Sequence, residues 1–258
     1  LFRECCPERL PGQGDLTMIR SIIASTVVVG VASLASAAIN YGNFSGITVD
    51  YFNVTENSTT DPGALFGTPT LAGNGLVFNP VSFGASSING ASPDITDGTL
   101  TATIVAKPGN FISQISIEES GDYTLFGNGT AATSVVVAAP VFFQIIEVNN
   151  APITPTTLSG TLTMSPSGTF SLPGSVVGGI WTGSGVFDLD AHLAGLGIDG
   201  SATKVILSLD NALVAQSEVG TVAFIKKKTF GGTSLTIVPE PTTLGLLAGT
   251  LLLASRRR

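Results

Sequence analysis

The sequence predicts an all-β body, an antiparallel β-sandwich or jelly roll, and three observations support this. Several segments alternate apolar and polar residues with period two, as half-buried strands do. Turn pairs such as Asn89-Gly90, Asp97-Gly98 and Asp199-Gly200 recur along the chain. Charged residues make up only 11% of the chain, and glycine, serine, threonine and alanine take their place. This composition favours strands and tight turns over helices.

The first element expected is a secretory signal peptide over residues 18–37. One positive charge, Arg20, precedes an apolar stretch that ends in a small-x-small pattern formed by Ala35 and Ala37. This order of parts is typical of signal peptides, whereas a strand or helix of the fold is the alternative. We expect the Sec translocon to export the chain and signal peptidase to cleave it between Ala37 and Ala38.

Residues 1–17 precede the first methionine, Met18, and we expect translation to start there. Both cysteines, Cys5 and Cys6, lie in this leader. The mature protein is therefore expected to have neither a disulfide nor a reactive thiol.

Residues 38–238 are predicted to form one sandwich domain. Clear alternation marks 97–107, 111–120 and 203–210 as strands. Residues 135–148 are more continuously apolar, which predicts a central strand buried on both faces, with a bend or bulge at Pro140. Residues 161–172 are predicted to form a hairpin around a turn at 165–168. Residues 188–197, with an acidic start and terminal glycines, are the best helix candidate.

The charge of this body argues against nucleic acid as a partner. All six arginines lie outside residues 38–238, which contain five lysines and 14 acidic residues, for a formal charge of −9. Phosphate contacts require surface cations, so an acidic and arginine-free body is a poor polyanion binder.

The sequence offers no catalytic or cofactor-binding residue that we would assign. His192 is the only histidine, with Asp188 and Asp190 nearby, but no G-x-S-x-G motif surrounds a serine. A glycosidase needs two carboxylates across a cleft, whereas Glu118-Glu119 is expected to be solvated at a strand end. With one tryptophan and three tyrosines, platforms for sugar stacking are scarce.

Two further features have a functional and a structural interpretation. The segments Ser92–Gly98 and Asp188–Asp190 place oxygens where calcium could bind, but acidic turn residues that cap their own backbone explain them better. We therefore assign no metal ligand. Lys226, Lys227 and Lys228 are expected on a sheet edge, where lysines discourage aggregation.

The C-terminal residues 239–258 carry the most specific pattern. Pro239, Glu240 and Pro241 are followed by a leucine-rich run over 242–255 and then by Arg256, Arg257 and Arg258. Fourteen residues span about 21 Å as a helix, which is short for a hydrocarbon core of about 30 Å. Terminal arginines would hold such a run on the cytoplasmic side and recover some length by snorkelling.

This arrangement resembles the PEP-CTERM sorting signal. The resemblance implies export across the inner membrane of a bacterium, transient retention by the C-terminal helix, and recognition by an exosortase. That enzyme would remove the tail and leave the body at the cell surface or in an exopolysaccharide matrix. The prolines agree with this, because they keep the segment before the membrane extended and accessible.

The sequence therefore predicts an exported, non-enzymatic surface or matrix protein. One alternative is a carbohydrate-binding or carbohydrate-processing sandwich with the same sorting tail. Another is a periplasmic protein that the tail holds permanently at the membrane.

Overall fold

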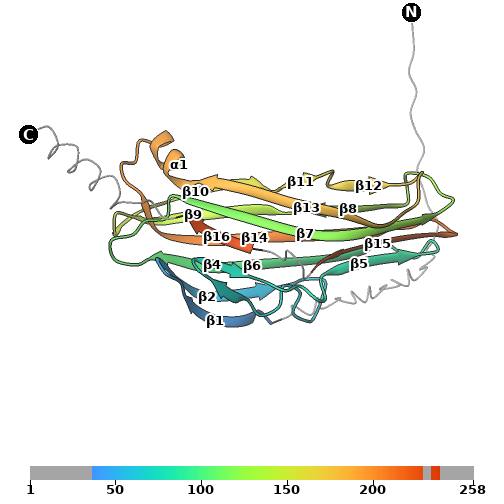
Figure 1. Cartoon of the computed structure of the whole chain (residues 1–258), viewed down its shortest axis with the longest axis horizontal. Helices are drawn as coiled ribbons and strands as arrows, with labels where there is room; N and C mark the ends of the chain where they lie inside the picture. Colours follow the sequence, from blue (N-terminus) through green and yellow to red (C-terminus); the bar gives the residue numbers. More distant parts are fainter. Residues whose placement is uncertain (1–36, 229–233, 239–258) are drawn as a thin grey trace, which may run out of the picture. The chain divides into compact units, whose positions relative to one another are not determined.

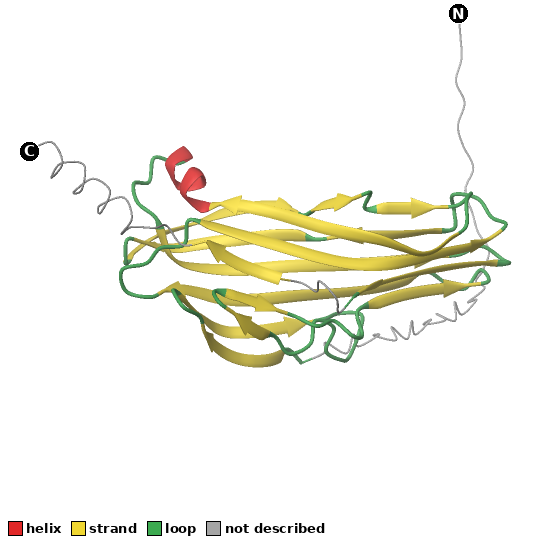
Figure 2. Cartoon of the chain, viewed as in Figure 1, coloured by secondary structure: helices red, strands yellow, loops and turns green. Residues whose placement is uncertain are grey.

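The computed structural model describes residues 37–228 and 234–238, all within one compact unit. They form two eight-stranded sheets in which every strand pair is antiparallel (Figures 1 and 2). The predicted all-β sandwich is thereby confirmed. Sheet A contains β1 (Ile39–Ser45), β2 (Val49–Asn57), β6 (Asp94–Ala106), β14 (Ala202–Gln216), β8 (Ser134–Ala138), β9 (Pro140–Val148), β10 (Ala151–Thr161) and β12 (Thr169–Ser171). Sheet B contains β3 (Thr70–Ala72), β4 (Gly75–Val77), β5 (Gly84–Ile88), β7 (Gln114–Gly127), β11 (Thr163–Ser165), β13 (Val176–Asp188), β15 (Thr221–Lys227) and β16 (Ser234–Val238).

Long central strands organise both sheets. In sheet A, β14 pairs with β6 along its length, and on its other side with β9 and then β8. In sheet B, β7 pairs with β13 on one side, and with β15 and β16 placed end to end on the other. Each central strand therefore runs the length of its sheet while shorter strands share its flank.

The core lies between the two sheets and follows the period-two pattern of the sequence. On β6, Leu100, Ala102 and Ile104 are buried while the intervening threonines are partly exposed. On β7, Ile115 and Ile117 are likewise buried, while Ser116 between them is partly exposed. Successive side chains of a strand point to opposite faces, so one face of each sheet supplies the core.

Two predicted strand arrangements are wrong. Residues 161–172 do not form a hairpin, because β11 pairs with β13 in sheet B whereas β12 pairs with β8 in sheet A. The segment 166–168 is therefore not a turn but carries the chain from one sheet to the other without reversing its direction. Residues 135–148 do break before Pro140, as expected, but they are not buried on both faces, since Phe142 is 44% exposed.

The predicted helix is confirmed as α1 (Leu189–Gly195). Asp188 is its N-cap and accepts a hydrogen bond from Ala191 N at 2.8 Å. Leu189 and Leu193, four residues apart, are fully buried. The helix thus packs one apolar stripe on the sandwich, as a short amphipathic helix should.

The two ends of the sandwich differ. The end with α1 also holds the β6–β7 loop and Val238, the last residue of β16, which pairs with Gln114 at the start of β7. We call it the exit end. The opposite, distal end holds the loops 128–133, 172–175 and 217–220 (Figure 1). β7 connects the two ends with 14 residues, or roughly 45 Å at 3.3 Å per residue.

Candidate functional site

Most of the sequence-predicted sorting residues lie outside the described part of the chain. These are Pro239, Glu240, Pro241, Arg256, Arg257 and Arg258, and Ala35 of the signal peptide. Ala37 and Ala38 are described and exposed, and β1 begins at Ile39. Among residues 37–228 and 234–238, none of the helical structure has the length and hydropathy of a membrane span.

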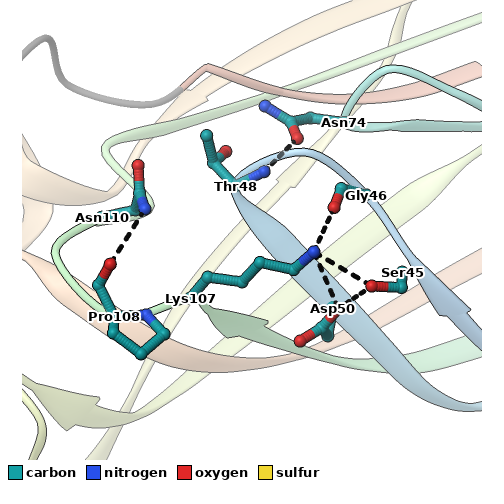
Figure 3. A network of polar contacts seen from close by, with 8 residues as sticks. All are labelled: Ser45, Gly46, Thr48, Asp50, Asn74, Lys107, Pro108 and Asn110. Carbon is teal, nitrogen blue, oxygen red and sulfur yellow. Dashed lines mark hydrogen bonds and ion pairs between the residues drawn. The ribbon is translucent and has the colours of Figure 1, made fainter.

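The exit end is held together by a lysine-centred network (Figure 3). Lys107 Nζ contacts Asp50 at 3.5 Å, Ser45 Oγ at 3.0 Å and the Gly46 carbonyl. Thr48 N donates to Asn74 Oδ1 at 2.7 Å. These contacts tie the β1–β2 turn to the β6–β7 and β3–β4 loops, so this lysine has a structural role near the point where β16 ends.

The candidate Ser-His-Asp residues are not arranged as a triad. His192 Nε2 lies 3.3 Å from Thr156 Oγ1, which belongs to β10. Asp188 is occupied by capping α1, and its second oxygen accepts from Gln114 Nε2 at 3.2 Å. Both side chains therefore fix α1 against the sandwich.

The acidic segment Ser92–Gly98 serves the backbone in the same way. Asp94 accepts from Ser86 N at 2.7 Å. Asp97 accepts from the backbone and hydroxyl groups of both Thr59 and Thr60 at 2.8–3.1 Å. Partial burial acts to raise the pKa of Asp97, but these hydrogen bonds outweigh it and lower that pKa. Among the described residues, no group of three or more His, Cys, Asp or Glu side chains could hold a metal ion.

The most unusual polar group of the described chain is an ion pair inside the core. Lys227 Nζ on β15 contacts Glu119 Oε2 on β7, and both side chains are 0% exposed. Glu118 and Glu119 were expected to be solvated at a strand end, but both lie inside β7, and only Glu118 is exposed. The edge position expected for Lys226–Lys228 is also wrong, because β15 lies between β5 and β7.

The period-two alternation of each strand would have predicted this burial if charged residues had been assigned to a face in the same way as apolar ones. Glu119 is in phase with Ile115 and Ile117, and Lys227 is in phase with Ala223 and Ile225. Side chains two apart share a face of the sheet, so both charges must point into the core. The usual exposure of glutamate and lysine concealed this signal.

Aromatic rings lie near Lys227 and near its cross-strand neighbour Gly121. Lys227 Nζ lies 5.2 Å from the Phe66 ring centroid and 5.0 Å from that of Phe83. Trp181 is opposite Gly121 in the β13–β7 register, and its indole occupies the space above that glycine. Lys227 is opposite Gly121 on the other side, so tryptophan, glycine and lysine form one row across three strands.

The electrostatics of the pair follow from its burial. Desolvation lowers the pKa of Lys227, opposed by the charge and hydrogen bond of Glu119. Of the two Glu119 oxygens, Oε2 contacts Lys227, whereas Oε1 has no hydrogen-bond partner among the described residues. Removing either partner of a buried ion pair costs about 3–5 kcal/mol, because the other charge is then stranded.

A polar hollow of about 510 Å³ lies at the distal end. Its lining comes from Gly127, Asn128, Gly129, Thr130, Pro173, Gly174, Ser175, Glu218 and Val219. Glu218 accepts from Thr130 N at 2.6 Å, and from the hydroxyls of Thr130 and Thr133 at 2.9 Å each. These hydrogen bonds, led by that from Thr130 N, lower the pKa of Glu218. The hollow therefore presents an ionised carboxylate beside exposed amide and hydroxyl groups of Asn128 and Ser175.

Comparisons with known proteins find weak likenesses to solved structures. No protein-family model and no curated protein matches the chain. A solved structure of endoglucanase 3 from family GH12 of Trichoderma harzianum is 12% identical, covers 67% of this chain and 94% of its own, and has a TM-score of 0.20. A structure of the infectious bursal disease virus Gt strain is also 12% identical, covers 81% of this chain and 57% of its own, and has a TM-score of 0.09.

Proposed function

We propose that the chain is an exported, non-enzymatic surface or matrix protein that an exosortase sorts through the C-terminal tail. Signal peptidase would release Ala38, and the Pro239-Glu240-Pro241 segment would be processed after the leucine-rich run has entered the inner membrane. The body would then act as a structural component of the cell surface or of an exopolysaccharide matrix, without a metal or cofactor.

The observation that carries this proposal is the position of β16. This strand pairs with the central strand β7 and ends at Val238, directly before Pro239. Ile237 is 2% exposed, so the folded body extends to the residue next to the sorting segment. On the N-terminal side of the chain, β1 begins at Ile39, and one residue, Ala38, separates it from the expected cleavage site. The described sandwich thus begins and ends, in sequence, next to the two segments that this proposal assigns to processing.

The first test is mass spectrometry of both termini of the protein recovered from a host with an exosortase. We expect a mature N-terminus at Ala38 and a C-terminus near Pro239–Pro241. Replacing Glu240 and Pro241 by alanine should leave the tail intact and hold the protein in the membrane fraction. The exposed body variant Glu118→Ala is the control and should be processed normally. Surface-located protein that still ends in Arg258 would contradict the proposal.

The distal hollow favours a second candidate, a carbohydrate-binding sandwich with the same sorting tail. Its carboxylate, amide and hydroxyl groups could form hydrogen bonds with a polyhydroxylated ligand, and it lies at the end of β7 opposite Val238. Reproducible binding to one polysaccharide on a glycan array, lost in Asn128→Ala and Ser175→Ala, would support this candidate. Binding unchanged by either substitution, or none at all, would argue for a purely structural body.

A further inference from the structure

We propose that Lys227 and Glu119 condense into an intramolecular amide bond that covalently joins β15 to β7. The two side chains are in direct contact, and both are fully buried. Glu119 lies on the central strand β7, and Lys227 lies on β15, whose register along β7 places it opposite Gly121. Lys227 N also donates to the Phe83 carbonyl at 2.9 Å, which fixes the backbone from which the side chain extends. The nucleophile and the electrophile are thus held in place by the sheet.

The reaction needs no oxidant and no co-reactant. A proton passes from the Lys227 ammonium to the Glu119 carboxylate, which leaves a neutral amine and a neutral carboxylic acid. The amine lone pair attacks Cδ of Glu119, and the Nζ–Cδ bond forms. One carboxyl oxygen then leaves with two protons as water. The products are one neutral amide and one water molecule, so atoms and charge balance.

The surroundings favour each of these steps. A water-poor core disfavours ions, so it promotes the proton transfer and makes the amine nucleophilic. Desolvation accordingly lowers the pKa of Lys227. Condensation also replaces two buried charges by one amide, and the released water gains bulk solvation. The rings of Phe66 and Phe83 flank the nitrogen and limit the access of water that would reverse the reaction.

A buried N–H donor lies near Glu119 in the register of the sheet. Trp181 is 0% exposed, and its indole N–H has no hydrogen-bond partner among the described residues. It lies over Gly121, two residues from Glu119 on the same face of β7. A donor that has no ground-state partner is free to stabilise an oxyanion.

The bond would give an exported chain a cross-link that needs no cysteine. Residues 38–238 contain no cysteine, and the linked residues are 108 positions apart. A covalent link across so long a loop restricts the unfolded chain much as a disulfide does. Unlike a disulfide, an amide is insensitive to reducing agents.

The test is the intact mass of the denatured, purified full chain, compared with the mass expected from its experimentally determined termini. We expect the protein to be lighter by one water, and a proteolytic digest to contain the Glu119 and Lys227 peptides joined. Lys227→Met and Glu119→Ala should restore the sequence mass. Glu119→Gln is the decisive variant, because it should reach the same amide by losing ammonia in place of water.

The neighbouring variants Lys228→Met and Glu118→Ala are the matched controls and should keep the cross-link. The wild-type measurement requires no variant to fold, so it decides the proposal alone. An unmodified wild-type mass would overturn it. Loss of one ammonia from the wild type would overturn the assignment to Glu119 and point to Asn211, a buried amide whose cross-strand neighbour Gly98 contacts the same two phenylalanine rings.

Discussion

At the residue scale, buried acids of this sandwich hold chain segments in place. Glu56, 1% exposed on β2, is an example. One of its oxygens accepts from Leu65 N, and the other accepts from Phe66 N at 3.1 Å and from Tyr41 Oη at 2.6 Å. A single carboxylate therefore fastens both the following loop and the edge strand β1 to β2. Burial, followed by the hydrogen bond and charge of Glu56, raises the pKa of Tyr41.

Replacing Glu56 by alanine should destabilise the protein by about 3 kcal/mol, because it strands two buried backbone N–H groups and one tyrosine hydroxyl. Urea unfolding followed by tryptophan fluorescence measures this change. Glu118→Ala, an exposed position on β7, is the control and should stay within about 0.5 kcal/mol of the wild type. Equal stabilities of the two variants would show that water replaces the Glu56 contacts.

Residue-scale features were only partly predictable from the sequence. Asp188 was predictable as a helix start, because a cap is local and depends on neighbours in the chain. The Glu119–Lys227 contact was not, since it joins residues 108 positions apart. Phase alone could indicate that each is buried, but only the pairing of β15 with β7 makes them partners.

At the element scale, β13 and β7 are held close by a glycine that accommodates a tryptophan. Trp181 is 0% exposed and lies against Gly121, its partner in the register. A Cβ atom added at Gly121 would lie under 3.0 Å from both the Trp181 ring and the Lys226 carbonyl. The packing between three strands thus depends on the absence of one side chain.

Gly121→Ala should therefore cost about 3 kcal/mol or more, because the core would be overpacked against the backbone as well as against a rigid ring. Gly195→Ala is the matched control. An added Cβ there meets nothing within 4 Å, and Gly195 is the last residue of α1. It should be neutral or stabilise by up to about 1 kcal/mol, since alanine favours the helix. Thermal or urea unfolding compares the two, and a Gly121→Ala protein as stable as Gly195→Ala would contradict the packing argument.

Strands were predictable from local patterns of the sequence. The predictions failed where the sheet position of a strand depends on which other strands it pairs with. Strands β6, β7 and β14 follow directly from alternation. The break at 165–168 was located correctly, but it is not a turn, because β11 and β12 run in the same direction and belong to different sheets. Proline, serine and glycine here predict a break in the strand, but they do not specify whether the chain reverses or which sheet receives the next strand. The lysines of β15 similarly suggested an edge, whereas β5 covers that strand.

At the scale of the whole molecule, the sandwich joins two ends of different character. The exit end gathers α1, the Lys107 network and the end of β16. The distal end is closed by the carboxylate of Glu218, which binds the β7–β8 loop to the β14–β15 loop. Asp97 binds the segment after β2 to β6 in the same way. In an acidic body with five lysines, hydroxyl and backbone N–H groups thus satisfy carboxylates where cations are scarce.

Acid should therefore destabilise the distal end and the connection between β2 and β6. The sign of this change follows from the difference in proton binding between the folded and the unfolded chain. The pKa values of Glu218 and Asp97 are lowered in the folded protein from their ordinary values of 4.5 and 3.8. Below those ordinary values the unfolded chain binds more protons than the folded one, so protons favour unfolding. The stability that these groups contribute is complete above pH 4.5 and is lost as pH falls through their folded pKa values.

The Glu218→Gln and Asp97→Asn double variant should be less stable than the wild type at pH 7 and should lose less stability between pH 5 and about pH 2. Urea unfolding at a series of pH values measures both slopes. Glu118→Gln is the control, because it removes one exposed carboxylate and leaves both hydrogen-bonded carboxylates in place. Parallel slopes for the wild type and the double variant would mean that threonine hydrogen bonds do not hold these carboxylates ionised. The acid sensitivity of the body would then have to arise from its net charge alone.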